Sequence, residues 1–212
     1  MKGLAAPDRG LAILLAALAG YVDSLGFLQL GGLFVSFMSG NSTRLAADLA
    51  QADWTAAATA AALLSLFVVG SMMGALVAGS GGPRSRSRVL ALETALLAAA
   101  AGTDATGLAP ITIALMVLAM AVENSVFLRN GEVGVSLTYM TGTLVKLGQA
   151  LAGAVRGGDP WAFRPYLALW AGLTGGALLG ALSYGAVGLT ALWGAAIASG
   201  ILMLVTRFSR AA

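Results

Sequence analysis

The chain has 212 residues, of which 58% are hydrophobic and 10% charged, and its formal net charge is +3. Soluble domains carry about 25% charged residues, so this chain has too little charge to cover a water-facing surface. The composition excludes a soluble globular enzyme and a disordered tail, and it predicts an integral membrane protein. Because the chain has no Cys and no His, it also excludes thiol nucleophiles, the usual zinc sites and haem ligation by His.

Six apolar stretches are each long enough to cross a bilayer, which takes about 20 residues of helix. In chain order they cover residues 11–30, 56–80, 89–106, 109–128, 165–187 and 188–208. Two shorter apolar stretches, 34–50 and 136–154, each start with a cluster of Ser, Thr and Gly. The pattern predicts an all-α integral membrane protein with six full transmembrane helices and two half-membrane elements.

The start of the chain is similar to a secretory signal. Lys2 and Arg9 precede the apolar residues 11–19, and residues 17–19 form an A-x-A pattern. The same kind of segment recurs in mid-chain, where no signal peptidase acts. We therefore expect the first span to be retained.

The basic residues predict the topology of the spans. They lie at Lys2, Arg9, Arg84, Arg86, Arg88, Arg129, Arg156, Arg164, Arg207 and Arg210. All of them fall in the cytoplasm, with both termini, if the two short stretches add no net crossing. The loop 103–108, which has no Lys or Arg, then lies outside.

The two halves of the chain match each other at a shift of 102 residues. Residues 36–45 then fall on 138–147 with Met, Gly and Leu identical, and Gly-x3-Gly at 70–74 falls on 172–176. The match predicts one membrane domain, 1–212, built from repeat one (10–106) and repeat two (108–208). Because three full spans per repeat is an odd number, the second copy has to be inserted upside down, giving an inverted 3+3 repeat.

The repeated motif predicts the ligand site. Residues 33–37 indicate an extended segment, Ser39-Gly40-Asn41 has the residue types of a helix start, and residues 42–51 continue as a short helix. Helix starts carry unpaired N–H groups and about half a positive charge, so two of them meeting at the midplane would bind an anion or polar group. The predicted substrate-binding residues are Ser39, Gly40, Asn41, Ser42, Thr141, Gly142 and Thr143. The alternative is that both motifs are tight packing turns between helices.

Five charged residues lie inside apolar stretches, where each costs about 2.5–3.5 kcal/mol or more. Asp23 and Glu123 occupy nearly matching places in the repeats and are predicted coupling or orienting acids that load a proton or sodium ion. Tyr21 or Asn124 could hydrogen-bond such an acid. Arg44 and Lys146 match each other, and they either neutralise these acids, attract an anionic substrate, or snorkel to the interface. Glu93 is expected to pair near the cytoplasmic rim, close to Arg88.

Small-x3-small faces at Gly70/Gly74 and Gly172/Gly176/Gly180 predict close helix packing within the chain, or a homodimer seam. A chain of this size has little scaffold to brace a moving core, so we expect a homodimer. The sequence shows no nucleophile–base pair, phosphate loop or paired acids at short spacing, so neither an enzyme nor a cofactor is expected. No basic face is long enough to follow nucleic acid phosphates, and the expected partners are the lipid bilayer and a small-molecule or ion substrate.

At its motifs the chain resembles the YoaK-like family of small bacterial multi-pass membrane proteins. The resembling residues are 20–24, 38–41, 123–125 and 140–148, and the likeness covers roughly residues 10–205. Ser39 stands where the family pattern has Thr, and Glu123 where it has Gln. The resemblance implies a bacterial inner-membrane location and leaves the substrate open, since the family is grouped as a domain of unknown function. The extended segment followed by a half helix also looks like the plan of the larger sulfate and uracil permeases.

Taken together, these features predict a secondary transporter or facilitator of a small anionic or polar solute. Two alternatives stay open at this point. One is a channel for a small solute or ion, which would need a continuous polar path. The other is a non-transporting membrane partner protein, in which both motifs would be packed dry.

Overall fold

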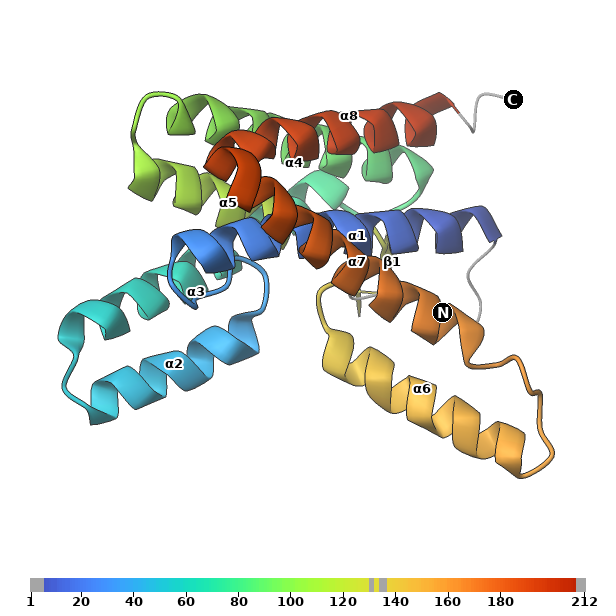
Figure 1. Cartoon of the computed structure of the whole chain (residues 1–212). Coiled ribbons are helices and arrows are strands. Elements are labelled where there is room, and N and C mark those ends of the chain that lie inside the picture. The colour runs from blue at the N-terminus through green and yellow to red at the C-terminus, as the bar shows by residue number, and fades with distance from the viewer. Residues whose placement is uncertain (1–5, 130–131, 134–136, 209–212) are drawn as a thin grey trace.

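The computed structural model describes residues 6–129, 132–133 and 137–208, and in these the chain is almost entirely helical (Figure 1). The helices are α1 (Ala6–Gln29), α2 (Met38–Ala50), α3 (Trp54–Ala78), α4 (Pro83–Asp104), α5 (Ala109–Glu123), α6 (Met140–Val155), α7 (Arg164–Val187), the short 3-10 helix η1 (Gly188–Ala191) and α8 (Leu192–Phe208). Two short strands, β1 (Leu128–Arg129) and β2 (Glu132–Val133), pair antiparallel between α5 and α6. Lys2, Arg210 and residue 136, which entered the sequence predictions, lie outside the described residues.

Three stretches among the described residues are long and apolar enough to cross a membrane. They are Pro7–Gln29, Trp54–Ala78 and Arg164–Phe208. The last stretch contains α7, η1 and α8, and Figure 1 shows that it folds into a hairpin at η1, where Gly188 has a φ of 60°. Helix α5 is shorter but also apolar. These helices confirm the coarse expectation of a membrane protein built from apolar helices.

Each long helix of the first half packs mainly on a helix of the second half, and we call these contacts the exchanged pairs. Helix α1 of the first half makes its main contacts with α7 of the second, and α3 packs on α5, while α4 packs on α8. Helices α4 and α5 also pack on each other. The core therefore runs through both halves of the chain, so neither half has a core of its own.

Glycines make the exchanged pairs close. A Cβ added at Gly176 or Gly180 of α7 would overlap carbonyl oxygens of α1, those of Ala17 and Tyr21 respectively. A Cβ at Gly70 would lie 3.0 Å from Leu118 of α5, and one at Gly74 would lie 2.6 Å from the hydroxyl of Ser125. These contacts favour the core-packing interpretation of the small-residue faces.

The contacts also refine how the two halves correspond. Gly74 faces Val122 and Ser125, and Gly180 faces Tyr21 and Ser24 in the same way. In space Gly74 thus corresponds to Gly180, one helical turn beyond the Gly176 that the shift of 102 assigns to it. The connection after α6, residues 156–163, is longer than the connection after α2, residues 51–53, which explains the extra turn.

A buried ion pair joins the starts of two helices. Arg86 near the start of α4 donates from both terminal nitrogens to Asp8 of α1, and both side chains are about nine-tenths buried. The guanidinium of Arg86 also lies 5.0 Å from the ring centre of Phe127. Such a pair contributes little net stability but is costly to break on one side, so it holds the two helix starts at the same end of the molecule.

Two predicted boundaries were wrong. The predicted span 89–106 begins six residues earlier in the structure, because Pro83 opens the helix and the basic residues up to Arg88 lie within α4. The predicted span 109–128 ends at Glu123, followed by turns and strand β1. Both errors matter for the buried acids, because they change the depth at which Glu93 and Glu123 lie in their helices.

The two short helices lie on opposite halves of the molecule. In Figure 1, α2 and α6 each begin near the centre and run outward, α2 toward the side of loop 105–108 and α6 toward the side of the C-terminal end of α8. Each packs on the helix that follows it, α2 on α3 and α6 on α7, and α2 does so more extensively.

Candidate functional site

Asp23 organises the extended segment that leads into α2. From α1 its Oδ1 accepts hydrogen bonds from the backbone N–H groups of Val35, at 2.9 Å, and Ser36, at 2.7 Å. A carboxylate that accepts two backbone bonds replaces the water these amides would otherwise need at membrane depth. The position predicted as a coupling or orienting acid thus holds the backbone of the motif in place.

Asn41 closes the same segment from the other side. Its Oδ1 accepts from the N–H of Phe34 at 2.9 Å, and its Nδ2 donates to the carbonyl of Phe34 at 2.7 Å. The residue is fully buried. Its amide therefore has both of its strong partners within the chain, and it faces the extended segment rather than a ligand.

The start of α2 differs in detail from the prediction. The residue before the helix is Phe37, with no side-chain cap, so Ser39, Gly40 and Asn41 lie in the first turn and do not cap it. A Cβ at Gly40 would lie 2.7 Å from the ring of Phe37, so only glycine lets this ring cover the helix start. The hydroxyl of Ser42 donates back to the carbonyl of Met38 at 2.9 Å. Ser39 is exposed on the same turn.

The second motif has the same plan with different partners. The helix begins at Met140 after an uncapped Tyr139, and Gly142 lies against the Tyr139 ring. Thr141 is exposed and Thr143 is buried. At the end of α5, Asn124 accepts from the hydroxyl of Thr138 at 3.3 Å, which ties the segment before α6 to α5.

This contact identifies the counterpart of Asp23. Asp23 bonds Ser36, and at the shift of 102 the residue matching Ser36 is Thr138, which bonds Asn124. Asn124 therefore occupies the place of Asp23, and Glu123 lies one residue before it, so the two acids occupy nearly matching places. The amide nitrogen of Asn124 donates to the Met120 carbonyl at 3.0 Å. Asn124 therefore makes no hydrogen bond to Glu93 or Glu123.

Two other expected partnerships are also absent. The hydroxyl of Tyr21 donates to the carbonyl of Ala191 in η1 at 3.1 Å and does not bind Asp23. Arg44 bonds Asp48 one turn ahead on α2 at 3.0 Å, so it does not neutralise Asp23. Arg44 and Asp48 thus form an i,i+4 pair on α2. The charge of Asp23 is stabilised by the backbone N–H groups that it accepts from.

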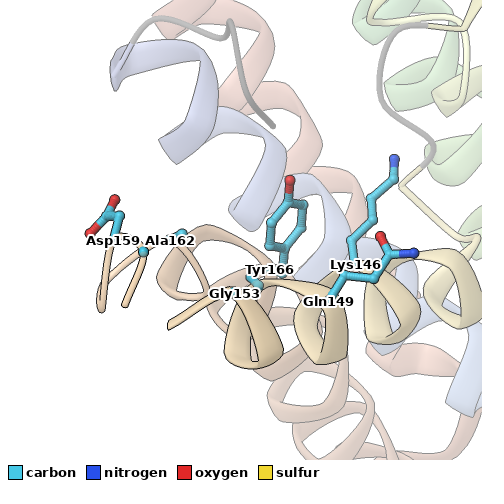
Figure 2. Close-up of a pocket in the computed structure, with 8 residues that line it drawn as sticks. Lys146, Gln149, Gly153, Asp159, Ala162 and Tyr166 are labelled. Carbon is cyan, nitrogen blue, oxygen red and sulfur yellow. The ribbon is translucent and has the colours of Figure 1, made fainter. Parts of the chain in front are cut away.

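Lys146 lies far along α6, beside a pocket of about 440 Å³ between α6, α7 and the loop that joins them (Figure 2). Figure 2 shows Lys146, Gln149 and the ring of Tyr166 pointing to the same side of α6 and α7, with Asp159 at the far end. None of the predicted residues Thr141, Gly142 and Thr143 lines this pocket. Lys146 is exposed, which is the arrangement expected of a side chain that reaches the interface.

Glu93 and Glu123 lie in the core of the molecule. Both side chains are fully buried, and none of their four carboxylate oxygens has a hydrogen-bond partner. The expectation that Glu93 pairs near the rim beside Arg88 was wrong, because α4 begins at Pro83 and Glu93 lies midway along its 22 residues. The signal was present in the sequence: Pro83 marks the helix start, and counting from it places the acid at mid-helix.

The polar groups of the two motifs are mainly hydroxyls, amides and backbone N–H groups, which can bind a solute by hydrogen bonds. Among the described residues no group of three or more His, Cys, Asp or Glu is placed to hold a metal ion. Ser39 and Thr141 are exposed in the first turns of α2 and α6, where backbone N–H groups have no partner along the helix itself.

Comparison with known proteins assigns the chain to a family. Residues 11–205 match the family described as a protein of unknown function, DUF1275. The chain belongs to this family. It is 32% identical over 195 residues to a UPF0700 transmembrane protein of Rhizobium meliloti (strain 1021), covering 91% of this chain and 84% of the relative. It is 30% identical over 147 residues to the UPF0700 transmembrane protein YoaK of Bacillus subtilis (strain 168), covering 66% of this chain and 65% of the relative.

The family assignment confirms the resemblance to YoaK-like proteins and establishes a membrane protein of a family whose function is unknown. No solved structure matches the chain. The likeness to sulfate and uracil permeases therefore stays a prediction.

Proposed function

We propose that the protein is a secondary transporter or facilitator of a small anionic or polar solute in the bacterial inner membrane. The observation that carries this proposal is the arrangement of α2 and α6. Both begin near the centre of the molecule and run outward to opposite sides, and both expose a hydroxyl in the first turn (Figure 1). Two helix starts that converge at mid-depth are the groups with which inverted-repeat transporters bind polar substrates.

The proposed topology is an inverted 3+3 repeat with six full spans and both termini in the cytoplasm. The exchanged pairs α1 with α7 and α3 with α5 support it, because a two-fold axis between inverted halves relates these pairs. The ion pair of Asp8 with Arg86 adds support, since it joins the N-terminal basic region to the basic start of α4. Both regions belong on the cytoplasmic side by the positive-inside rule.

In this proposal the residues of the motif divide into two roles. Asp23, Asn41 and Asn124 hold the extended segments, while Ser39 and Thr141 touch the solute together with backbone N–H groups. The division follows from the contacts, since the first three side chains are already bonded within the chain and the last two are exposed. The homodimer expected from the small size of the chain stays a prediction.

Uptake into proteoliposomes tests the proposal, using a panel of small anions and nucleobases. Ser39→Ala and Thr141→Val remove the two outward hydroxyls and are expected to lower uptake by about fivefold each, the effect of one hydrogen bond of about 1 kcal/mol. Ser42→Ala is the matched control, because its hydroxyl already bonds Met38, and it should leave uptake unchanged. Equal uptake in all three variants and the parent would refute the site.

A second candidate function is a non-transporting membrane partner protein, and the packing of the first motif favours it. Asn41 is fully buried and the Phe37 ring lies against Gly40, so this part of the motif is packed within the chain. The two candidates differ in the uptake assay, where a partner protein moves none of the solutes in the panel.

A further inference from the structure

The buried acids Glu93 and Glu123 come from two helices that pack closely, α4 and α5. Glu93 lies midway along α4, and Glu123 is the last residue of α5. Both side chains have no solvent exposure, and both are among the largest fully buried side chains of the described residues. The two carboxyls are close enough to interact electrostatically with each other.

Four acceptor atoms at this place have no donor. Neither oxygen of Glu93 nor of Glu123 receives a hydrogen bond. Ser199 of α8 lies beside Glu93, but its hydroxyl is 2.8 Å from the hydroxyl of Thr94. Because Thr94 donates its own proton to the Leu90 carbonyl, Ser199 is the donor of this bond. An ionised carboxylate buried at membrane depth without a donor or a counter-charge is strongly disfavoured, and two such groups side by side are disfavoured further.

No basic group compensates the pair among the described residues. Helix α3 and η1 carry no charged residue, α8 carries Arg207 in its last turn, and α1 brings Asp23, which is bonded to backbone amides. On α4, Arg86 is paired with Asp8 at the start of the helix, and the charged group that faces Glu123 is Glu93 itself. Arg88 of α4 and Arg9 of α1 are exposed near the starts of their helices. The two buried carboxyls are therefore not neutralised by a basic side chain of the described residues.

We propose that Glu93 and Glu123 form one proton-binding site, in which at least one proton is held between the two carboxyls at neutral pH. A proton needs no cavity, and a carboxylic acid beside a carboxylate turns one unpaired acceptor into a donor for the other. Sodium would need several oxygen ligands around it, and among the described residues no group of three or more His, Cys, Asp or Glu is placed to hold a metal ion.

The site is placed where it can couple to movement. Glu123 ends α5, and the next residue, Asn124, ties the segment before α6 to α5 through Thr138. Release of the proton would leave two repelling carboxylates between α4 and α5, and their separation would move the end of α5 and with it the start of α6. The role as a coupling site rests on the proposed transport function, whereas the bound proton does not.

Infrared spectroscopy of the full chain in liposomes tests the proposal directly. The chain has three glutamates, Glu93, Glu123 and Glu132, so carbon-13 labelling of glutamate assigns a protonated carboxyl band to this small set. The wild type is expected to show a labelled carboxylic acid band at neutral pH that moves in heavy water and disappears in alkali. The double variant E93Q/E123Q should lose this band.

Two controls keep the result specific. Glu132→Gln removes the third glutamate of the chain, and it should leave the band unchanged. Gln has the shape of a protonated Glu, so Glu93→Gln and Glu123→Gln are expected to fold with a Tm no lower than that of the wild type. If the double variant fails to fold, the labelled band of the wild type still decides whether a glutamate is protonated.

Three results would overturn the proposal. They are the absence of a labelled acid band in the wild type at neutral pH, its persistence in a folded E93Q/E123Q variant, and its loss when sodium is added at constant pH, which would identify a sodium site. A protein that shows the band but transports nothing would refute the proposed function and leave the proton site standing.

Discussion

The two repeated motifs share a backbone plan but differ in how firmly it is held. In the first, the charged Asp23 accepts two backbone bonds and Asn41 makes two more, so four hydrogen bonds fix residues 34–36. In the second, a neutral Asn124 bonds one hydroxyl at 3.3 Å, and Thr143 stands where the first has Asn41. Helix α2 also packs more extensively on its neighbour than α6 does. Among the described residues the first motif is therefore held by more bonds, and we expect the first half to form the rigid wall of the proposed site and the second half its adjustable side.

The pair α1–α7 is packed more closely than the pair α3–α5, and glycine variants compare the two. Gly176→Ala places a methyl group against the carbonyl oxygen of Ala17, which cannot move aside, and should destabilise the protein by about 3 kcal/mol or more. Gly74→Ala meets the Ser125 hydroxyl, which can rotate, and the Val122 backbone at 3.0 Å, a looser contact than that at Gly176, so it should cost about 1–2 kcal/mol.

Thermal unfolding in detergent, followed by circular dichroism, measures both effects. Gly175→Ala is the matched control, since nothing lies within 4 Å of its added Cβ, and it should leave Tm unchanged or slightly raise it. If Gly175→Ala and Gly176→Ala lowered Tm equally, the close α1–α7 contact would be refuted.

Truncating the polar side chains at the matching positions 41 and 143 tests which motif is held more firmly. Asn41→Ala leaves both polar groups of Phe34 without partners in a buried place and should destabilise by about 2–4 kcal/mol. Thr143→Ala, at the matching position of α6, should cost about 1 kcal/mol or less. The same unfolding assay compares them, and a larger loss for Thr143→Ala would reverse the assignment of the rigid half.

Replacing Asp23 by Asn gives the first motif the residue type that the second motif has at Asn124. Asp23→Asn keeps the oxygen that accepts from Val35 and Ser36 but removes its charge, so these bonds weaken to neutral ones and stability falls by about 1 kcal/mol. Asp23→Ala removes both bonds and should cost about 2–3 kcal/mol. Hydrogen exchange of the amides of Val35 and Ser36 reports this locally: exchange as slow in Asp23→Ala as in the wild type would contradict the assigned role.

The smallest effect is expected at Arg44. Its pair with Asp48 is half exposed on the arginine side, so Arg44→Ala should change the free energy of unfolding by about 0.5 kcal/mol or less, less still in high salt. Chemical unfolding at low and high salt measures this. If Arg44→Ala lowered the free energy of unfolding by several kcal/mol at both salt concentrations, Arg44 would have to make a buried interaction beyond its pair with Asp48.

Several of these features could be read from the sequence, and the reason differs for each. The span 165–187 was predicted to within one residue of α7, because Pro165 at its start and Gly188 at its end are strong helix boundaries. The pairing of Arg44 with Asp48 follows from helical spacing alone, although it was not predicted. These are local features, for which the neighbouring residues carry the information.

The rest depends on contacts between distant segments. The partner of Asn41 is the backbone of Phe34, and any residue there would offer the same N–H and carbonyl, so no residue type marks it. The match of Asp23 with Asn124 is visible in the sequence at a shift of 101 residues, where 22–24 fall on 123–125, but the hydrogen bonds that these two side chains make are not. The approach of Glu93 to Glu123 requires knowing that α4 packs on α5, which neither helix encodes by itself.

The central claim, that α2 and α6 begin together at mid-depth and open to opposite sides of the membrane, is tested most directly by labelling. The chain has no cysteine, so single cysteines at Ala52, after α2, and Gly158, after α6, can be probed in intact cells with a membrane-impermeant maleimide. The account predicts that Cys at 52 is labelled from outside, like a reference at Thr106, and that Cys at 158 is labelled only after the cells are opened. Labelling of both 52 and 158 from the same side would contradict it.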